Sequence, residues 1–132
     1  MATRTDARVA VISILFAHDS GNDKALANRD ALYEEKKIRN KQRDFANALL
    51  DGVLANLPKV DELIEASLKD WTYDRIGKVD KAVLRLGVYE LLFTDTDRPV
   101  IMNEAINIAK ELCADESPKF INGILDKIKK AD

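Results

Sequence analysis

The residues with the clearest potential to bind a ligand lie near the C-terminus, in residues 115–123. Ser117 followed by Pro118 predicts a helix start, because a serine hydroxyl can cap the first turn and proline has no amide to lose there. Phe120 would lie about 90° from the centre of this helix's apolar stripe. An aromatic ring beside Lys119 and free amides could stack a nucleic-acid base while a phosphate meets the amides. The alternative is that Phe120 packs against a neighbouring helix, as boundary aromatics usually do.

No other residues form a pattern that is typical of catalysis or metal binding. His18 and Cys113 are the only histidine and cysteine, so the chain can build neither an internal disulfide nor a Cys/His zinc cluster. The five glycines stand singly, which excludes a glycine-rich phosphate loop. We expect His18 on the buried side of the first helix, in a structural role. The sequence therefore predicts no enzyme activity, no cofactor and no metal site.

The composition is typical of one globular helical protein. The 132 residues are 46% hydrophobic and 33% charged, which argues against disorder. Long amphipathic segments without an alternating strand predict an all-α fold. No segment approaches the roughly 20 apolar residues that cross a bilayer, and the N-terminus lacks the apolar core of a signal peptide. We therefore expect a cytoplasmic protein without membrane contact.

The charge balance limits how the chain could hold nucleic acid. Its formal net charge is −2, and neither half is basic. A protein that holds nucleic acid alone usually has a basic face, so RNA binding here should be weak or shared with a partner. The one dense cluster of cations is diluted by neighbouring acids, which favours a solvated face over a phosphate site. This basic cluster consists of Lys36, Lys37, Arg39, Lys41 and Arg43.

Hydrophobic periodicity predicts about seven helices. They are expected at about 5–17, 24–37 and 41–55, from Pro58, at about 76–93, from Pro99 and from Ser117. The helix at 76–93 is the most apolar and should be central. Gly87 within it indicates a point where another helix crosses closely. In the connection before this helix, Trp71 is expected to close the core, and Tyr73 could stack a base.

The first helix is apolar over an unusually wide arc. Val11 and Ile14 lie on one side, and Val9, Ile12 and Phe16 form a second apolar face. A helix that is apolar over most of its circumference is either central or presents its second face to a partner. Both interpretations of the second face stay open at this point.

Two sequence blocks resemble the NusB family of bacterial transcription antitermination factors, and the resemblance covers nearly the whole chain. The first block is GKVDKAVLRLGVYEL at residues 77–91. The second begins with Asn103, Glu104 and Ala105, continues through Ile108, Ala109 and Lys110, and ends in ESPKFING at residues 116–123 with Leu125 and Asp126 after it. Arg4 and residues 7–16 are similar to the family's arginine-containing first helix.

The resemblance implies one all-helical domain over residues 1–132, built from two packed small helical bundles. The N-terminal helices would span about 5–55 and the C-terminal helices about 58–130. Family members bind the boxA element of nascent RNA together with NusE, a ribosomal small-subunit protein, in the RNA polymerase antitermination complex. They prevent premature termination in ribosomal RNA operons. The negative net charge agrees with such a shared site, since each partner then needs fewer cations.

By position, the family's RNA surface falls on Arg4, Arg8, Glu116, Lys119 and Phe120. The two arginines would hold phosphates, Phe120 would stack a base and Lys119 would add positive charge. Glu116, where relatives usually have aspartate, would accept from a base edge or restrain affinity by repelling phosphate. Relatives often carry a run of arginines in the first helix. With two arginines here, RNA affinity is expected to be lower, or the basic cluster contributes to it.

The NusE surface falls on Phe16 and Asp80, where many relatives have Tyr and Glu. The second apolar face adds Val9 and Ile12 to this partner surface. Without a phenolic hydroxyl, the Phe16 contact must be apolar. Two other hypotheses remain. A similar helical domain serves as the RNA-positioning module of RNA cytosine methyltransferases, and a homodimer could form through Val9, Ile12 and Phe16.

Overall fold

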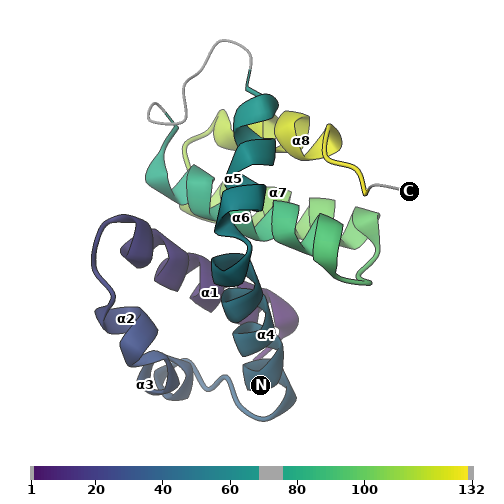
Figure 1. Cartoon of the computed structure of the whole chain (residues 1–132). Coiled ribbons are helices and arrows are strands. Elements are labelled where there is room, and N and C mark those ends of the chain that lie inside the picture. Colours follow the sequence, from purple (N-terminus) through teal and green to yellow (C-terminus); the bar gives the residue numbers. More distant parts are fainter. Residues whose placement is uncertain (1, 69–75, 131–132) are drawn as a thin grey trace.

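The computed structural model describes residues 2–68 and 76–130, and over these residues it contains eight helices and no strand (Figure 1). This confirms the predicted all-α fold. The helices are α1 (Arg4–Asp19), α2 (Lys24–Ala27), α3 (Arg29–Glu35), α4 (Lys41–Ala55), α5 (Leu57–Ala66), α6 (Lys78–Phe93), α7 (Arg98–Leu112) and α8 (Ser117–Asp126). Trp71 and Tyr73, for which roles were predicted, lie outside the described residues.

Helix α6 is the centre of the fold, as the sequence predicts. It contacts α1 and α4 as well as α5, α7 and α8. In Figure 1 it crosses the molecule between α1 to α4 below and α7 and α8 above. Its residues from Ala82 to Val88 are all buried, because helices cover it on every side. The side chains of α6 therefore connect the N-terminal helices to the C-terminal ones.

Gly87 lies where α8 packs closely against α6. A Cβ atom at residue 87 would lie 3.0 Å from Cδ1 of Leu125 and 3.1 Å from its Cδ2. Leu125 is fully buried, so its side chain has little room to move aside. The expected role of Gly87 in close helix packing is confirmed.

Helix α1 has a capped first turn and packs in the centre of the fold. Thr3 forms a capping box with Asp6, which satisfies amides at the helix start. The second apolar face of α1 is divided: Phe16 is 38% exposed and Val9 half-buried, whereas Ile12 is 2% exposed and belongs to the core. The prediction of Ile12 as a partner contact was therefore wrong, because α6 and α7 cover it.

Three local predictions differ from the structure. The helix expected at 24–37 is broken at Asn28, whose side-chain amide and backbone amide both donate to the carbonyl of Lys24. His18 is half-buried near the helix end, with its Nδ1 2.6 Å from Asp23, rather than on the buried side. Ser117 is the first residue of α8 and is itself buried, so Glu116 takes the cap position without a side-chain hydrogen bond.

The C-terminal helices follow the predicted pattern more closely. Pro58 lies in the first turn of α5, and Ile121, Ile124 and Leu125 form the buried face of α8. None of the helices in the described part of the chain is long and apolar enough to span a membrane.

Gly52 and Gly123 offer a matched test of the packing between α4 and α6. A Cβ at residue 52 would overlap the phenol ring of Tyr89, whereas a Cβ at residue 123 would meet nothing. Gly52→Ala should lower the free energy of unfolding by about 1–3 kcal/mol through overpacking. Gly123→Ala should raise it by about 0.5–1 kcal/mol, because alanine favours the helix. Urea unfolding measures both; equal effects would contradict the described packing of Tyr89.

Candidate nucleic-acid interface

The start of α8 presents three of the predicted RNA residues on one edge of the fold. Glu116 and Lys119 are exposed, and Phe120 is half-buried against the hydrophobic core. The buried face of α8 fixes the helix, so the first turn holds these side chains at defined positions. Both interpretations of Phe120 thus apply in part: its ring packs against the core and still borders a pocket.

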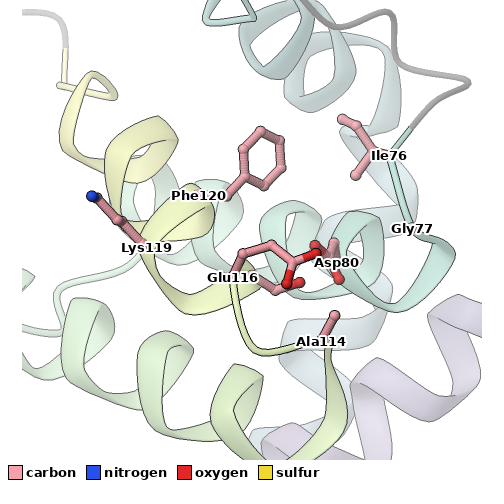
Figure 2. A pocket seen from close by; sticks show the side chains of 8 residues that line it. Ile76, Gly77, Asp80, Ala114, Glu116, Lys119 and Phe120 are labelled. Carbon is pink, nitrogen blue, oxygen red and sulfur yellow. The ribbon is translucent and has the colours of Figure 1, made fainter.

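A pocket of about 460 Å³ lies between the start of α8 and the start of α6 (Figure 2). The carboxylates of Asp80 and Glu116 point toward each other in it, and the ring of Phe120 lies above them. Ile76 faces Phe120, while Lys119 points away from the two carboxylates. The pocket therefore combines an aromatic wall with hydrogen-bond acceptors. Its lining residues are Ile76, Gly77, Asp80, Ala114, Glu116, Ser117, Lys119 and Phe120.

Cys113 supports Asp80 from the end of α7. Burial raises the pKa of the Cys113 thiol to about 12, and a hydrogen bond to Asp80 contributes to this rise. The thiol therefore stays protonated at neutral pH and donates to the carboxylate. This contact could not be predicted from the sequence, because Cys113 lies 33 residues after Asp80 without any local pattern.

Arg8 does not belong to an RNA surface, contrary to the prediction. Its side chain is 2% exposed, with Nε 3.0 Å from Glu90 and Nη1 2.9 Å from Glu104. Thr5 also donates to Glu104. Burial raises the pKa of Glu90 despite the opposing charge of Arg8. A guanidinium that is buried and neutralised by two carboxylates cannot hold a phosphate, so Arg8 joins α1 to α6 and α7 instead.

Arg4 is exposed but lies far from Phe120. Its guanidinium lies 4.6 Å from the ring centroid of Phe45 and borders a pocket at the C-terminal end of α6. Asp80, which lines the pocket at Phe120, lies in the first turn of α6, and Thr94, which lines the pocket at Arg4, lies just beyond the last turn. The two pockets are therefore roughly 20 Å apart along the helix axis. The structure therefore does not bring Arg4 and Phe120 into one pocket.

The predicted partner residues lie where the end of α1 meets the start of α6. Asp19 accepts from Lys81 at 2.9 Å and lies 3.4 Å from Arg85. Burial alone would raise the pKa of Asp19, but the hydrogen bond to Lys81 and the nearby cations together lower it. Phe16 precedes Asp19 by one helical turn and Asp80 precedes Lys81. This ion pair therefore fixes Phe16 and Asp80 relative to each other.

The basic cluster after α3 is a solvated face, as the sequence favours. Glu34 pairs with Arg39 at 2.5 Å and with Arg43 at 3.2 Å. The lysines of the cluster, Lys36, Lys37 and Lys41, are exposed. Two of its five cations thus share the single negative charge of Glu34.

Comparisons with known proteins agree with these observations. A sequence model described as the NusB family matches residues 5–130. The transcription antitermination protein NusB of Sulfurovum sp. (strain NBC37-1) is 54% identical over 130 residues, which cover 98% of this chain and 100% of that protein. The protein of the same name from Sulfurimonas denitrificans is 52% identical, with 98% of each chain covered.

Two solved structures share the fold. The structure of T. maritima NusB has a TM-score of 0.83 and 37% identity, with 96% of this chain and 90% of that chain covered. A crystal structure of the antitermination factors NusB and NusE in complex with dsRNA has a TM-score of 0.84 and 29% identity. It covers 95% of this chain and 94% of the matched chain.

Replacing Arg8 tests its structural role. Arg8→Met leaves the Glu90 carboxylate buried without its cation, so the free energy of unfolding should fall by about 3–5 kcal/mol. The double variant Arg8→Met, Glu90→Leu should recover most of this loss, because no uncompensated charge remains. Urea unfolding of both variants and of Arg4→Gln measures the effect. A loss for Arg8→Met no greater than for Arg4→Gln would contradict the buried ion pair.

The same variant has a defined pH dependence. Glu90 has a raised pKa in the folded protein, so the folded state binds its proton more readily than the unfolded state does. In Arg8→Met the destabilisation should therefore shrink as pH falls through the raised pKa of folded Glu90, where this carboxyl becomes neutral, and most of it should be gone by the ordinary glutamate pKa of about 4.3, where the unfolded chain is protonated too.

Proposed function

This chain belongs to the NusB family, and we propose that it is a non-enzymatic antitermination factor that binds boxA RNA together with NusE. It would act in the bacterial cytoplasm during transcription of ribosomal RNA operons, where the assembled complex prevents premature termination. The observation that carries the proposal is that Phe120 and Asp80, one from each expected contact surface, line the same pocket. Relatives matched over their full length favour this role over that of a methyltransferase module.

The start of α8 forms the main RNA contact in this proposal. A base stacks on the exposed part of the Phe120 ring, and Lys119 meets a phosphate. Glu116 and Asp80 add two negative charges beside that base, so Glu116 restrains the affinity by repelling phosphate. Arg4 holds a phosphate farther along the strand. Arg8 has no part in this surface because it is buried.

Phe16, Val9 and Asp80 form the NusE contact. Phe16 is among the few large apolar side chains that the described residues expose, and Val9 lies two turns earlier on the same face of α1. Asp80 continues this surface into the pocket at α8. The RNA and protein partners therefore meet along one edge of this chain, so each can stabilise the binding of the other.

The distribution of cations supports a shared RNA site. Several arginines are held in internal ion pairs, whereas Arg4 and Lys119 form no ion pair with any described residue. The two cations on the proposed RNA surface neutralise few phosphates, so NusE must supply the remaining positive charge at this site. The net charge of −2 agrees with this division.

Truncating Phe120 tests the base contact. Phe120→Ala should weaken RNA binding by about 1–3 kcal/mol in the presence of NusE, since one stacked base is lost. Val100→Ala, which shortens a side chain that is 45% exposed on α7, is the control and should leave affinity unchanged. Filter binding with boxA RNA measures both variants, and thermal unfolding verifies their fold. Unchanged affinity of Phe120→Ala would rule out the proposed stacking.

Charge substitutions test the protein contact. Phe16→Glu places a charge in an apolar contact and Asp80→Lys reverses a charge, so each should reduce recovery of NusE in a pull-down at least tenfold. Asn107→Glu adds an acid at an exposed position of α7 and should have no effect. If neither substitution reduces recovery, the partner surface lies elsewhere. Sedimentation of the chain alone distinguishes a homodimer through Phe16, which would compete with NusE.

A further inference from the structure

The pocket at the start of α8 holds two carboxylates that face each other. Asp80 and Glu116 point toward each other in it, while Lys119 points away from both (Figure 2). Neither carboxylate forms an ion pair within residues 2–68 and 76–130. A role of Glu116 in repelling phosphate does not explain why the two acids face each other.

The helix starts beside the pocket offset only part of this negative charge. Helices α6 and α8 both begin here, and the start of a helix carries about half a positive elementary charge. Together the two starts offset about one of the two negative charges. Like charges that face each other repel unless a cation lies between them. The pocket therefore keeps a negative charge that attracts a cation.

Ser117 adds a third oxygen to the pocket and is an independent sign of a ligand. The residue is only 5% exposed, and its side chain is among those that line the pocket. Within the described residues its hydroxyl forms no hydrogen bond, yet the oxygen is not completely enclosed, so it faces the space of the pocket. A buried hydroxyl without a partner costs free energy unless a ligand or a water contacts it.

The ligand atoms favour a hard cation over a transition metal. The two carboxylates and the hydroxyl offer oxygen, which Mg²⁺ and Ca²⁺ prefer, whereas Zn²⁺ is usually bound by His or Cys. The thiol of Cys113 stays protonated and donates to Asp80, so it is not a metal ligand. The described residues contain no group of three or more His, Cys, Asp or Glu side chains that could hold a metal ion. A cation here must therefore keep water ligands.

Mg²⁺ fits these conditions better than Ca²⁺. It keeps several waters and is usually bound by one or two carboxylates together with phosphate groups, whereas Ca²⁺ takes about six to eight oxygen ligands. The pocket has a volume of about 460 Å³, and each water needs about 30 Å³. An ion with its waters therefore fits between the carboxylates, and the ring of Phe120 remains available as a wall.

We propose that Asp80, Glu116 and Ser117 hold one hydrated Mg²⁺ ion, which binds a phosphate of the RNA strand beside Phe120. The contact with a phosphate rests on the proposed function, whereas the cation site itself does not require RNA. The ion turns two carboxylates that repel RNA into a point of attachment for it. The site is not apparent from the sequence, because Asp80 and Glu116 lie 36 residues apart.

Cation binding by the chain alone is the first test. Mn²⁺ prefers similar oxygen ligands and is paramagnetic, so free Mn²⁺ is measured by electron paramagnetic resonance during a titration at constant ionic strength. Glu116→Gln removes one charge and keeps the shape of the side chain. Glu35→Gln makes the same change at an exposed residue of α3 outside the pocket and is the matched control.

Glu116→Gln should bind Mn²⁺ about tenfold more weakly than Glu35→Gln, the usual cost of removing a group that holds a metal ion directly or through water. Mg²⁺ should displace Mn²⁺ from the wild-type chain. Ser117→Ala removes only one oxygen, so it should keep the thermal unfolding temperature and bind Mn²⁺ a few-fold more weakly. Equal Mn²⁺ affinity in Glu116→Gln and Glu35→Gln would overturn the inference, and unchanged affinity in Ser117→Ala would contradict the three-ligand site.

The contact with phosphate is tested by RNA affinity with NusE present, with and without Mg²⁺ at matched ionic strength. Mg²⁺ should raise the affinity of the wild-type chain for boxA RNA several-fold. Without Mg²⁺, Glu116→Gln should bind RNA more tightly than the wild type, because one repelling charge is gone. Mg²⁺ should then add little to its affinity. An equal gain in both proteins would mean that Mg²⁺ acts on the RNA, and the phosphate contact would be wrong.

The outcomes distinguish this inference from the proposed function. If the wild-type chain does not bind Mn²⁺, or if Mg²⁺ does not displace it, the inference fails while Phe120→Ala still tests the function. If the wild-type chain with NusE does not bind boxA RNA, the proposed function fails, and the Mn²⁺ titration alone decides on the cation site. If putrescine, an organic diamine, displaces Mn²⁺ more effectively than Mg²⁺ does, the pocket binds an amine and the inference is wrong.

Discussion

The close approach of α8 to α6 is the constraint on which the rest of the structure depends. Leu125 of α8 lies so near α6 that a Cβ at residue 87 would be 3.0 Å from its Cδ1, which only glycine avoids. This crossing places the first turn of α8 beside the first turn of α6. Phe120, Glu116 and Asp80 meet in one pocket for this reason. The position of the candidate site is therefore a consequence of core packing.

Features that depend on local sequence were predictable, and features that depend on distant partners were not. The apolar faces of α6 and α8 follow from periodicity, and Gly87 stands out as a glycine within a buried helix. The burial of Arg8 has no local signal, because its partners Glu90 and Glu104 are 82 and 96 residues away. From the sequence alone, Arg8 was expected to be a cation on the surface. The resemblance to the NusB family identified Phe120 and Asp80, but their shared pocket required the fold.

The use of cations in this chain agrees with the proposal that it binds RNA together with a partner. Arg8 and Arg85 are buried, and they pair with Glu90 and Asp19 on helices far from their own in the sequence. Arg39 and Arg43 share Glu34. These four arginines thus maintain the fold or are paired at the surface, while Asp80 and Glu116 place negative charge beside Phe120. In the proposed complex this chain would contribute stacking and shape, and the phosphate contacts would fall mainly to NusE.

The salt dependence of RNA affinity tests most directly whether NusE makes most of the phosphate contacts. The number of phosphates neutralised is given by the slope of log K against log salt concentration, about 0.7 per phosphate for a single strand. Titrating boxA RNA with this chain alone and then with NusE compares the two slopes. We predict weak binding with a shallow slope for the chain alone, and tighter binding with a steeper slope for the chain together with NusE. Equal affinity and equal slope with and without NusE would contradict it.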